Sequence, residues 1–239
     1  MNVIKRNGTT EPLNLDKIHK MVEFACEGLA GTSASQVEMS SNLQFTDGIK
    51  SEDIQHILIR AASDLISEET PNYQYVAARL LLFGLRKNLY ARIHELPTLI
   101  DQIQRGVDKG IYDQDILKKY SEKEIETLDN IIDHERDYLF TYAGLRQVVD
   151  KYLVQDRSTG EVYETPQFMY MLIAMTIFAE YPPESRLDYV TRYYNAISRH
   201  KINIPTPIMG GVRTPIRQFA SCVLVDIDDT LDSIFTSDM

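Results

Sequence analysis

Apolar and polar residues alternate at the amino terminus in a pattern typical of two short extended segments. These segments, residues 3–6 and 9–13, flank the pair Asn7-Gly8. Because this dipeptide tolerates the positive φ angles of a tight turn, the pattern predicts a β-hairpin at the start of the chain.

Apolar residues recur at helical spacing after the hairpin, first between Ile18 and Leu29. Ser35 and Glu38 form a capping-box pattern that predicts the start of a second, shorter helix. Ser51 is the expected N-cap of a third helix, because two acidic residues and a new apolar stripe follow it. Pro71 precedes the pattern of another helix. The first ninety residues are therefore expected to form a β-hairpin and about four helices.

The helical pattern continues from about residue 96 to residue 200. Ser121 and Glu124 form a second capping-box pattern, and residues 152–163 are expected to fold as a small hairpin. Residues 168–179 are almost entirely apolar, which predicts a buried helix, and residues 185–198 predict another. Five residues lie on one helical stripe and are expected to belong to the core rather than to a cofactor site: Tyr138, Tyr142, Leu145, Val149 and Tyr152.

The pattern changes at Lys201, where prolines and glycines interrupt short apolar segments. Residues 202–209 and 219–225 are expected to form two short strands joined by a Gly/Pro loop. Strands that follow a helical region are typical of the start of a larger α/β domain. The expected fold class is therefore mainly α with α+β parts.

Composition narrows the possible functions. The 25 Lys and Arg residues against 35 Asp and Glu residues give a net charge of −10. This balance argues against an open nucleic-acid surface, so any bound phosphate must be held locally. The chain shows no signal-peptide pattern, and its longest apolar run is well short of the ~20 residues that span a membrane. We expect a cytoplasmic protein with neither a membrane nor a nucleic acid as partner.

The sequence contains no HExxH, P-loop or GxGxxG motif, which excludes zinc-hydrolase and P-loop chemistry. Five cations remain as candidates for ligand binding. They are either solvated surface charges, the usual place for such residues, or they converge on a triphosphate: Lys5, Arg6, Lys17, Arg86 and Lys87.

Cys26 and Cys222 are the only cysteines, so the chain has neither a disulfide framework nor a cysteine pair for zinc. Cys26 lies on the apolar stripe of the first helix and is expected to pack there. Cys222 lies beside Ser221 in an apolar segment. It either fills the core from a strand or acts as a redox thiol, which would require a partner thiol.

Longer motifs carry a family resemblance. The segments KRNGTTEPLNLDKI, PNYQYVAARLLLFGLRK, HERDYLFTYAG, KYLVQDRSTGEVYETPQF and IPTPIMGGVRTPIRQFASCVLV, in this order, resemble the amino-terminal third of the large (alpha) subunit of class I ribonucleotide reductase. The resemblance implies an ATP-cone domain over residues 1–92, a helical domain over 93–200, and the first strands of a ten-stranded α/β barrel over 201–239.

The resemblance also implies an ATP or dATP site in the cone, which acts as an on/off signal for overall activity. By matched position, the site would be lined by Lys5, Glu11, Asn14, Lys17, Ser51, Ile54 and Lys87. Several cations around a triphosphate would give charge-assisted contacts despite the acidic chain. Gln55 and Gly84 stand where some family members have histidines, which leaves inhibition by dATP open.

In the barrel, the resemblance makes Thr206 and Ser221 contacts of a ribonucleoside diphosphate substrate, and Cys222 one of two redox-active thiols. A thiyl radical takes the 3′ hydrogen, the 2′ hydroxyl leaves as water, and the dithiol supplies two electrons and becomes a disulfide. The segment Asp229, Thr230 and Leu231 would begin a site for dNTP effectors.

Because the family's radical cysteine and second redox cysteine have no counterpart in this sequence, a second polypeptide is expected to supply them. The other expected partners are the small (beta) subunit with its di-iron tyrosyl radical, and thioredoxin or glutaredoxin; no metal is expected in this chain. Two interpretations follow: one part of a split large subunit, inactive alone, or a free-standing ATP-cone module that senses nucleotides without catalysis. We favour the split subunit, because a separate module has no use for barrel strands with costly unpaired edges.

Overall fold

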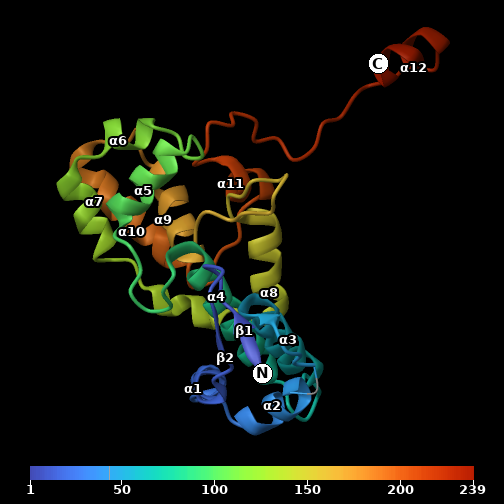
Figure 1. Cartoon of the computed structure of the whole chain (residues 1–239). Helices are drawn as coiled ribbons and strands as arrows, with labels where there is room; N and C mark the ends of the chain where they lie inside the picture. The colour runs from blue at the N-terminus through green and yellow to red at the C-terminus, as the bar shows by residue number, and fades with distance from the viewer. Residues whose placement is uncertain (43) are drawn as a thin grey trace.

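The computed structural model describes residues 1–42 and 44–239. A small mixed sheet lies at the amino terminus, where β1 (Asn2–Ile4) pairs antiparallel with β2 (Thr10–Pro12). The connecting turn contains Gly8 at a φ of 81°, which confirms the predicted hairpin. β3 (Ile49–Lys50) adds a parallel pairing on the other side of β1, in the order β2-β1-β3 (Figure 1). The two-residue strand β3 was not predicted, because so short a segment has no periodicity.

The four helices expected in the first ninety residues are confirmed: α1 (Leu15–Cys26), α2 (Ala34–Asn42), α3 (Ser51–Asp64) and α4 (Tyr73–Tyr90). Two of the predicted starts are wrong, that of α2 by two residues and that of α3 by one. α2 begins at Ala34, so Ser35 lies inside the helix, and the N-cap of α3 is Lys50 rather than Ser51. Ser51 is the first helical residue, and the pairing of Lys50 in β3 brings the chain to that point in extended form.

The rest of the described chain is mainly helical. The predicted capping box at Ser121 and Glu124 is confirmed. The elements that follow α4 are α5 (Leu99–Asp108), α6 (Asp115–Lys119), α7 (Glu122–Asp129), the 3-10 helix η1 (His134–Leu139), α8 (Tyr142–Gln147), the π-helical turn η2 (Val148–Tyr152), α9 (Pro166–Ile177), α10 (Pro183–Ile197), α11 (Thr206–Gly211) and α12 (Leu231–Asp238). A single bridge between Gln155 and Val162 closes the predicted small hairpin.

The stripe from Tyr138 to Tyr152 is not one helix. Tyr138 belongs to η1, and α8 starts only after Thr141, whose hydroxyl accepts a hydrogen bond from the Gly144 amide at 3.2 Å. Periodicity alone predicts one continuous helix here, but the cap at Thr141 starts a new helix between Tyr138 and Tyr142. The side chains still pack against the core, as predicted.

Two hydrophobic cores share helix α4. One core gathers the apolar residues of β1, α1, α3 and α4, and the other surrounds the buried helix α9. Leu80 and Phe83 face the first core, whereas Leu82 and Leu85 face the second. Because side chains alternate around a helix at 3.6 residues per turn, α4 presents apolar residues on both sides. Figure 1 shows α4 between the sheet with α1–α3 and the group that contains α5–α10.

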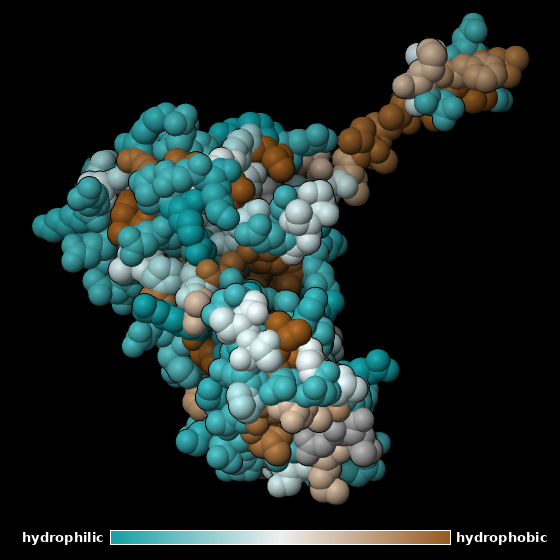
Figure 2. Space-filling view, viewed as in Figure 1, coloured by the Kyte–Doolittle hydropathy of each residue, from teal (hydrophilic) through white to brown (hydrophobic). Residues whose placement is uncertain are grey.

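The two strands predicted after Lys201 are wrong. Thr206–Gly211 forms the short helix α11, and residues 219–225 form neither a helix nor a strand. Val223 is 75% exposed and Leu224 is 97% exposed. A strand requires a neighbour for its backbone hydrogen bonds, and the described residues offer none here. Figures 1 and 2 show this segment as a narrow, largely hydrophobic extension that ends in α12.

None of the helices described in the structure combines the length and the hydropathy that crossing a membrane requires.

Candidate functional site

A cavity of about 1150 Å³ opens between the hairpin, the start of α1, the start of α3 and the end of α4. Its wall continues along the segment between α4 and α5. All seven residues predicted to bind a nucleotide line this cavity: Lys5, Glu11, Asn14, Lys17, Ser51, Ile54 and Lys87. Residues far apart in the sequence are thus brought to one place by the sheet and the packing of α1, α3 and α4.

Glu11 arranges two of the cations. Its Oε1 atom lies 3.1 Å from Lys5 Nζ and 3.6 Å from Lys17 Nζ. The hydrogen bond and charge of Lys5, with the charge of Lys17, hold the pKa of Glu11 below its ordinary value. Asn14 caps α1, because its side-chain oxygen accepts a hydrogen bond from the Lys17 backbone amide at 3.0 Å. This bond fixes the backbone of Lys17, the second of the two cations. The carboxylate therefore keeps two ammonium groups at the mouth of the cavity.

Lys87 is a cation in a less solvated position. Burial, together with the nearby charges of Arg6 and Lys5, lowers its pKa below the ordinary value. Its ammonium group lies 3.6 Å from Met21 Sδ, and it forms no ion pair with any acidic residue in the described part of the chain. A partly buried cation beside two others is poised to gain stability from a bound anion.

Gln55 lines the cavity, and Gly84 packs against its side chain. The Gln55 amide is buried and donates a hydrogen bond to the Leu80 carbonyl at 2.7 Å. A Cβ atom at position 84 would lie 3.1 Å from Gln55 Cγ, so the missing side chain makes room for the glutamine. One N–H of the Gln55 amide is therefore engaged, and this position presents no ring nitrogen to a ligand.

Arg86 lies neither at the surface nor in the wall of the cavity, so both predicted positions for this residue are wrong. Its side chain is buried beneath α4, and Nη2 donates to Asp137 Oδ2 at 2.9 Å and to the His134 carbonyl at 2.7 Å. Neighbouring helical residues point about 100° apart, so Arg86 reaches η1 whereas Lys87 lines the cavity.

The cavity also contains residues that sequence reasoning missed. Asn88 accepts a hydrogen bond from Arg6 Nε at 2.6 Å and so ties the hairpin to the end of α4. Arg105 lies on α5, where its guanidinium stacks 4.8 Å from the centre of the Tyr90 ring. Arg92 lines the same segment and pairs with Glu95. No local pattern distinguishes these residues, because they reach the cavity only through tertiary packing.

The residues matched to a substrate site lie on the other side of the molecule's second core. Thr206 begins α11, and its hydroxyl oxygen lies 3.4 Å from the hydroxyl oxygen of Tyr152. Ser221 and Cys222 are adjacent and exposed in the extended segment, with 3.9 Å between Oγ and Sγ. Within the described ranges, no hydrogen bond joins Thr206 to either of them.

Exposure of Cys222 contradicts the interpretation that it fills a core, because the strand on which that interpretation depended is not formed. Cys26 is half-buried against the first core, as predicted, and burial raises the pKa of its thiol.

The residues matched to an effector site, Asp229, Thr230 and Leu231, are exposed at the start of α12. The Thr230 hydroxyl caps this helix by accepting from the Ser233 amide at 3.2 Å. In the chain as described, outside residue 43, no group of three His, Cys, Asp or Glu residues is placed to hold a metal ion.

Comparison with known proteins adds to this geometry. Residues 1–88 match the ATP cone domain, and residues 138–217 match the ribonucleotide reductase all-alpha domain. The chain is 53% identical over 232 residues to the ribonucleoside-diphosphate reductase 1 subunit alpha of Escherichia coli (strain K12), which covers 97% of this chain and 30% of the relative. The subunit alpha of Enterobacteria phage T4 is 47% identical over 236 residues, 98% of this chain and 31% of the relative. The chain thus spans less than a third of the length of these relatives.

Proposed function

Since the chain belongs to the ribonucleotide reductase alpha-subunit family, as an amino-terminal portion with the ATP cone and the all-alpha domain, we propose that its large cavity binds ATP or dATP as an allosteric effector. All seven residues matched from the family resemblance lie on one cavity, and this convergence is the observation that carries the proposal. We place the cone at residues 1–92, the helical domain at 93–200 and the start of the reductase barrel at 201–239.

The charges of the cavity suit a triphosphate. Lys5 and Lys17 are held at its mouth by Glu11, and Lys87 lies deeper with its charge uncompensated by a carboxylate in the described residues. A triphosphate would supply that compensation through charge-assisted hydrogen bonds. Ile54 offers an apolar surface to the base or the sugar.

Gln55, which lines the cavity beside Gly84, bears on regulation. ATP and dATP differ only in the 2′ hydroxyl group of the ribose. A protein that responds differently to the two nucleotides therefore needs a side chain that contacts this hydroxyl. Gln55 carries no ring nitrogen, and one N–H of its buried amide is held by the Leu80 carbonyl. We propose that ATP and dATP bind with similar effect, so that dATP does not shut off activity through this chain.

We also propose that the chain supplies part of a reductase active site. Thr206 and Ser221 would contact a ribonucleoside diphosphate, and Asp229, Thr230 and Leu231 would contact a dNTP effector. In the net reaction, Cys222 and a second thiol give up two electrons and two protons. The ribose 2′ carbon gains a hydrogen in place of its hydroxyl, which leaves as water, and the two sulfurs form a disulfide.

A second polypeptide is proposed to carry the radical cysteine, the second redox thiol and the rest of the barrel, with a beta subunit supplying the radical and thioredoxin or glutaredoxin supplying electrons. The exposed apolar residues Val223, Leu224 and Phe235 support this, because large apolar side chains gathered in one exposed segment are costly unless another chain covers them. The competing function, a free-standing ATP cone that only senses nucleotides, leaves those side chains without a role.

The test is to mix the chain with the complementary polypeptide and a beta subunit, and to measure reduction of a ribonucleoside diphosphate. We expect activity in the mixture and multiple turnovers with thioredoxin. Cys222→Ser should abolish multiple turnovers, whereas Cys26→Ser should keep them. A wild-type mixture that forms no complex and no product would contradict the split-subunit proposal, and turnover by the Cys222→Ser variant would remove the redox role of that thiol.

A further inference from the structure

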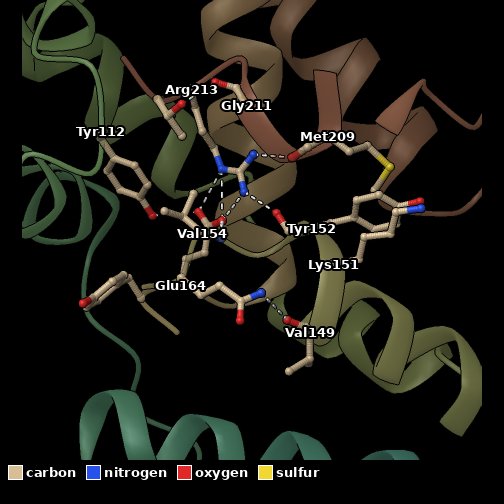
Figure 3. A network of polar contacts seen from close by, with 12 residues as sticks. Tyr112, Val149, Lys151, Tyr152, Val154, Glu164, Met209, Gly211 and Arg213 are labelled. Carbon is tan, nitrogen blue, oxygen red and sulfur yellow. Dashed lines mark hydrogen bonds and ion pairs between the residues drawn. The ribbon is translucent and has the colours of Figure 1, made fainter. Parts of the chain in front are cut away.

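A buried ion pair joins three distant segments beside α11. Arg213 Nε donates to both carboxylate oxygens of Glu164 at 3.0 Å, and neither side chain is exposed (Figure 3). The same carboxylate accepts from the Val154 amide at 2.8 Å and from the Tyr112 hydroxyl at 2.7 Å. Glu164 is therefore fixed from several directions and gives the guanidinium a rigid support.

Nη2 of Arg213 also donates to Glu164 Oε1, and the guanidinium further contacts two backbone carbonyls, one of them in α11. Nη1 donates to the carbonyl of Met209 in α11, and Nη2 donates to the carbonyl of Tyr152 at 2.9 Å. The hydroxyl oxygen of Tyr152 lies 3.4 Å from that of Thr206. One guanidinium thus holds both the helix that carries Thr206 and the residue that contacts its hydroxyl.

Helix α11 needs such support. It has only six residues, and no side chain caps its start at Pro205. Isolated helices of this length are unstable in water, so tertiary contacts must hold them in place. Arg213 provides a planar, forked set of donors that reaches a carboxylate and two carbonyls at once, which a lysine ammonium on a flexible stem cannot reproduce.

We propose that Arg213, supported by Glu164, is a positioning residue for the substrate site: it sets where the hydroxyl of Thr206 meets the ribonucleoside diphosphate. This inference rests on the proposed function, in which Thr206 is a substrate contact. Arg213 itself is buried and acts only through α11 and Tyr152.

Hydrogen exchange on the chain alone tests the first half of the inference. In Arg213→Lys, the amides of Met209 and Val212 should exchange about tenfold faster than in the wild type, because α11 loses a charge-assisted hydrogen bond. Arg186→Lys is the matched control, since Arg186 forms a comparable pair with Glu124 between α10 and α7, at 2.8 Å from Nε. Equal exchange of these two amides in the two variants would overturn the proposal.

Kinetics of the reconstituted reductase test the second half. Arg213→Lys should raise the KM for the ribonucleoside diphosphate about tenfold, and Arg186→Lys should leave it unchanged. In a Thr206→Ala background, Arg213→Lys should raise KM less than about twofold, because a residue that acts through Thr206 has nothing left to position. Additive effects would mean a general structural role and would overturn the proposal.

The two arms separate this inference from the proposed function. A wild-type mixture that reduces no substrate refutes the proposed function and, with it, the assignment to the substrate site. Hydrogen exchange still decides in that case whether Arg213 holds α11.

Discussion

Replacement of Lys87 by methionine separates binding from stability in the cavity of the cone. The change keeps an unbranched side chain of similar length but removes a charge whose pKa is lowered by burial and by Arg6 and Lys5. A charge-assisted hydrogen bond to a phosphate contributes about 1.5–3 kcal/mol. Because each 1.4 kcal/mol is a factor of ten, Lys87→Met should weaken ATP binding about 10- to 150-fold.

The same variant should be more stable than the wild type without nucleotide. Lys87 binds protons less readily in the folded chain than in the unfolded chain, so its charge opposes folding below the folded pKa. That penalty disappears as pH rises toward the ordinary value of 10.5, where the unfolded lysine also loses its proton. Lys87→Met should therefore raise the Tm at pH 7, and the gain should shrink at alkaline pH.

Titration calorimetry with ATP and thermal unfolding followed by circular dichroism measure the two effects. Lys20→Met is the matched control, because Lys20 lies exposed on α1 and is not part of the cavity wall. Equal ATP affinity in the wild type and in Lys87→Met would refute the assignment of the cavity. A lower Tm in Lys87→Met without ligand would refute the account of its charge.

Three further predictions, two substitutions and one titration, test the packing. Gly106→Ala should destabilise the chain to urea by about 1–3 kcal/mol or more, although alanine favours helices, because the added Cβ would overlap the ring of Tyr112. Arg86→Met should cost about 3–5 kcal/mol by leaving Asp137 buried and unpaired. That loss should shrink as pH falls, since burial raises the pKa of Asp137 and protonation removes the isolated charge. In an NMR titration, His134 should show a pKa of about 4, because burial and then the charge of Arg86 lower it.

Local patterns were sufficient for most of the helices and for the first hairpin. Asn7-Gly8 and the spacing of apolar residues act within a few positions, so they can be recognised without knowledge of the fold. The capping box at Ser121 and Glu124 was found for the same reason. The short strand β3 depends on pairing with β1, far away in the sequence, and has no local pattern of its own.

The errors after Lys201 have a different physical cause. Residues 202–209 contain isoleucines in alternation, but Pro207 fits the first turn of a helix, and α11 forms there. Residues 219–225 have the composition of a strand but meet no partner strand among the described residues. Strand propensity describes how well a segment fits an existing sheet, so it could not decide this case.

The residues that line the cavity were predicted from the family resemblance. Comparison with known proteins confirms that resemblance. The burial of Arg86 could not be predicted in this way. Arg86 and Lys87 are adjacent residues of similar character, and only the position of Asp137, on η1, determines that one of them is buried.

Helix α4 contributes buried residues to both cores, so we expect the two cores to unfold as one cooperative unit. A break in the chain after residue 90 would leave the apolar side of this helix, with Leu82 and Leu85, facing water. The cone and the helical region should therefore melt in a single transition rather than in two. Binding of a nucleotide at Lys87 should then stabilise the whole unit against unfolding. Amides in α9, which lies outside the cone's core, should therefore exchange their hydrogens more slowly when the cavity is filled.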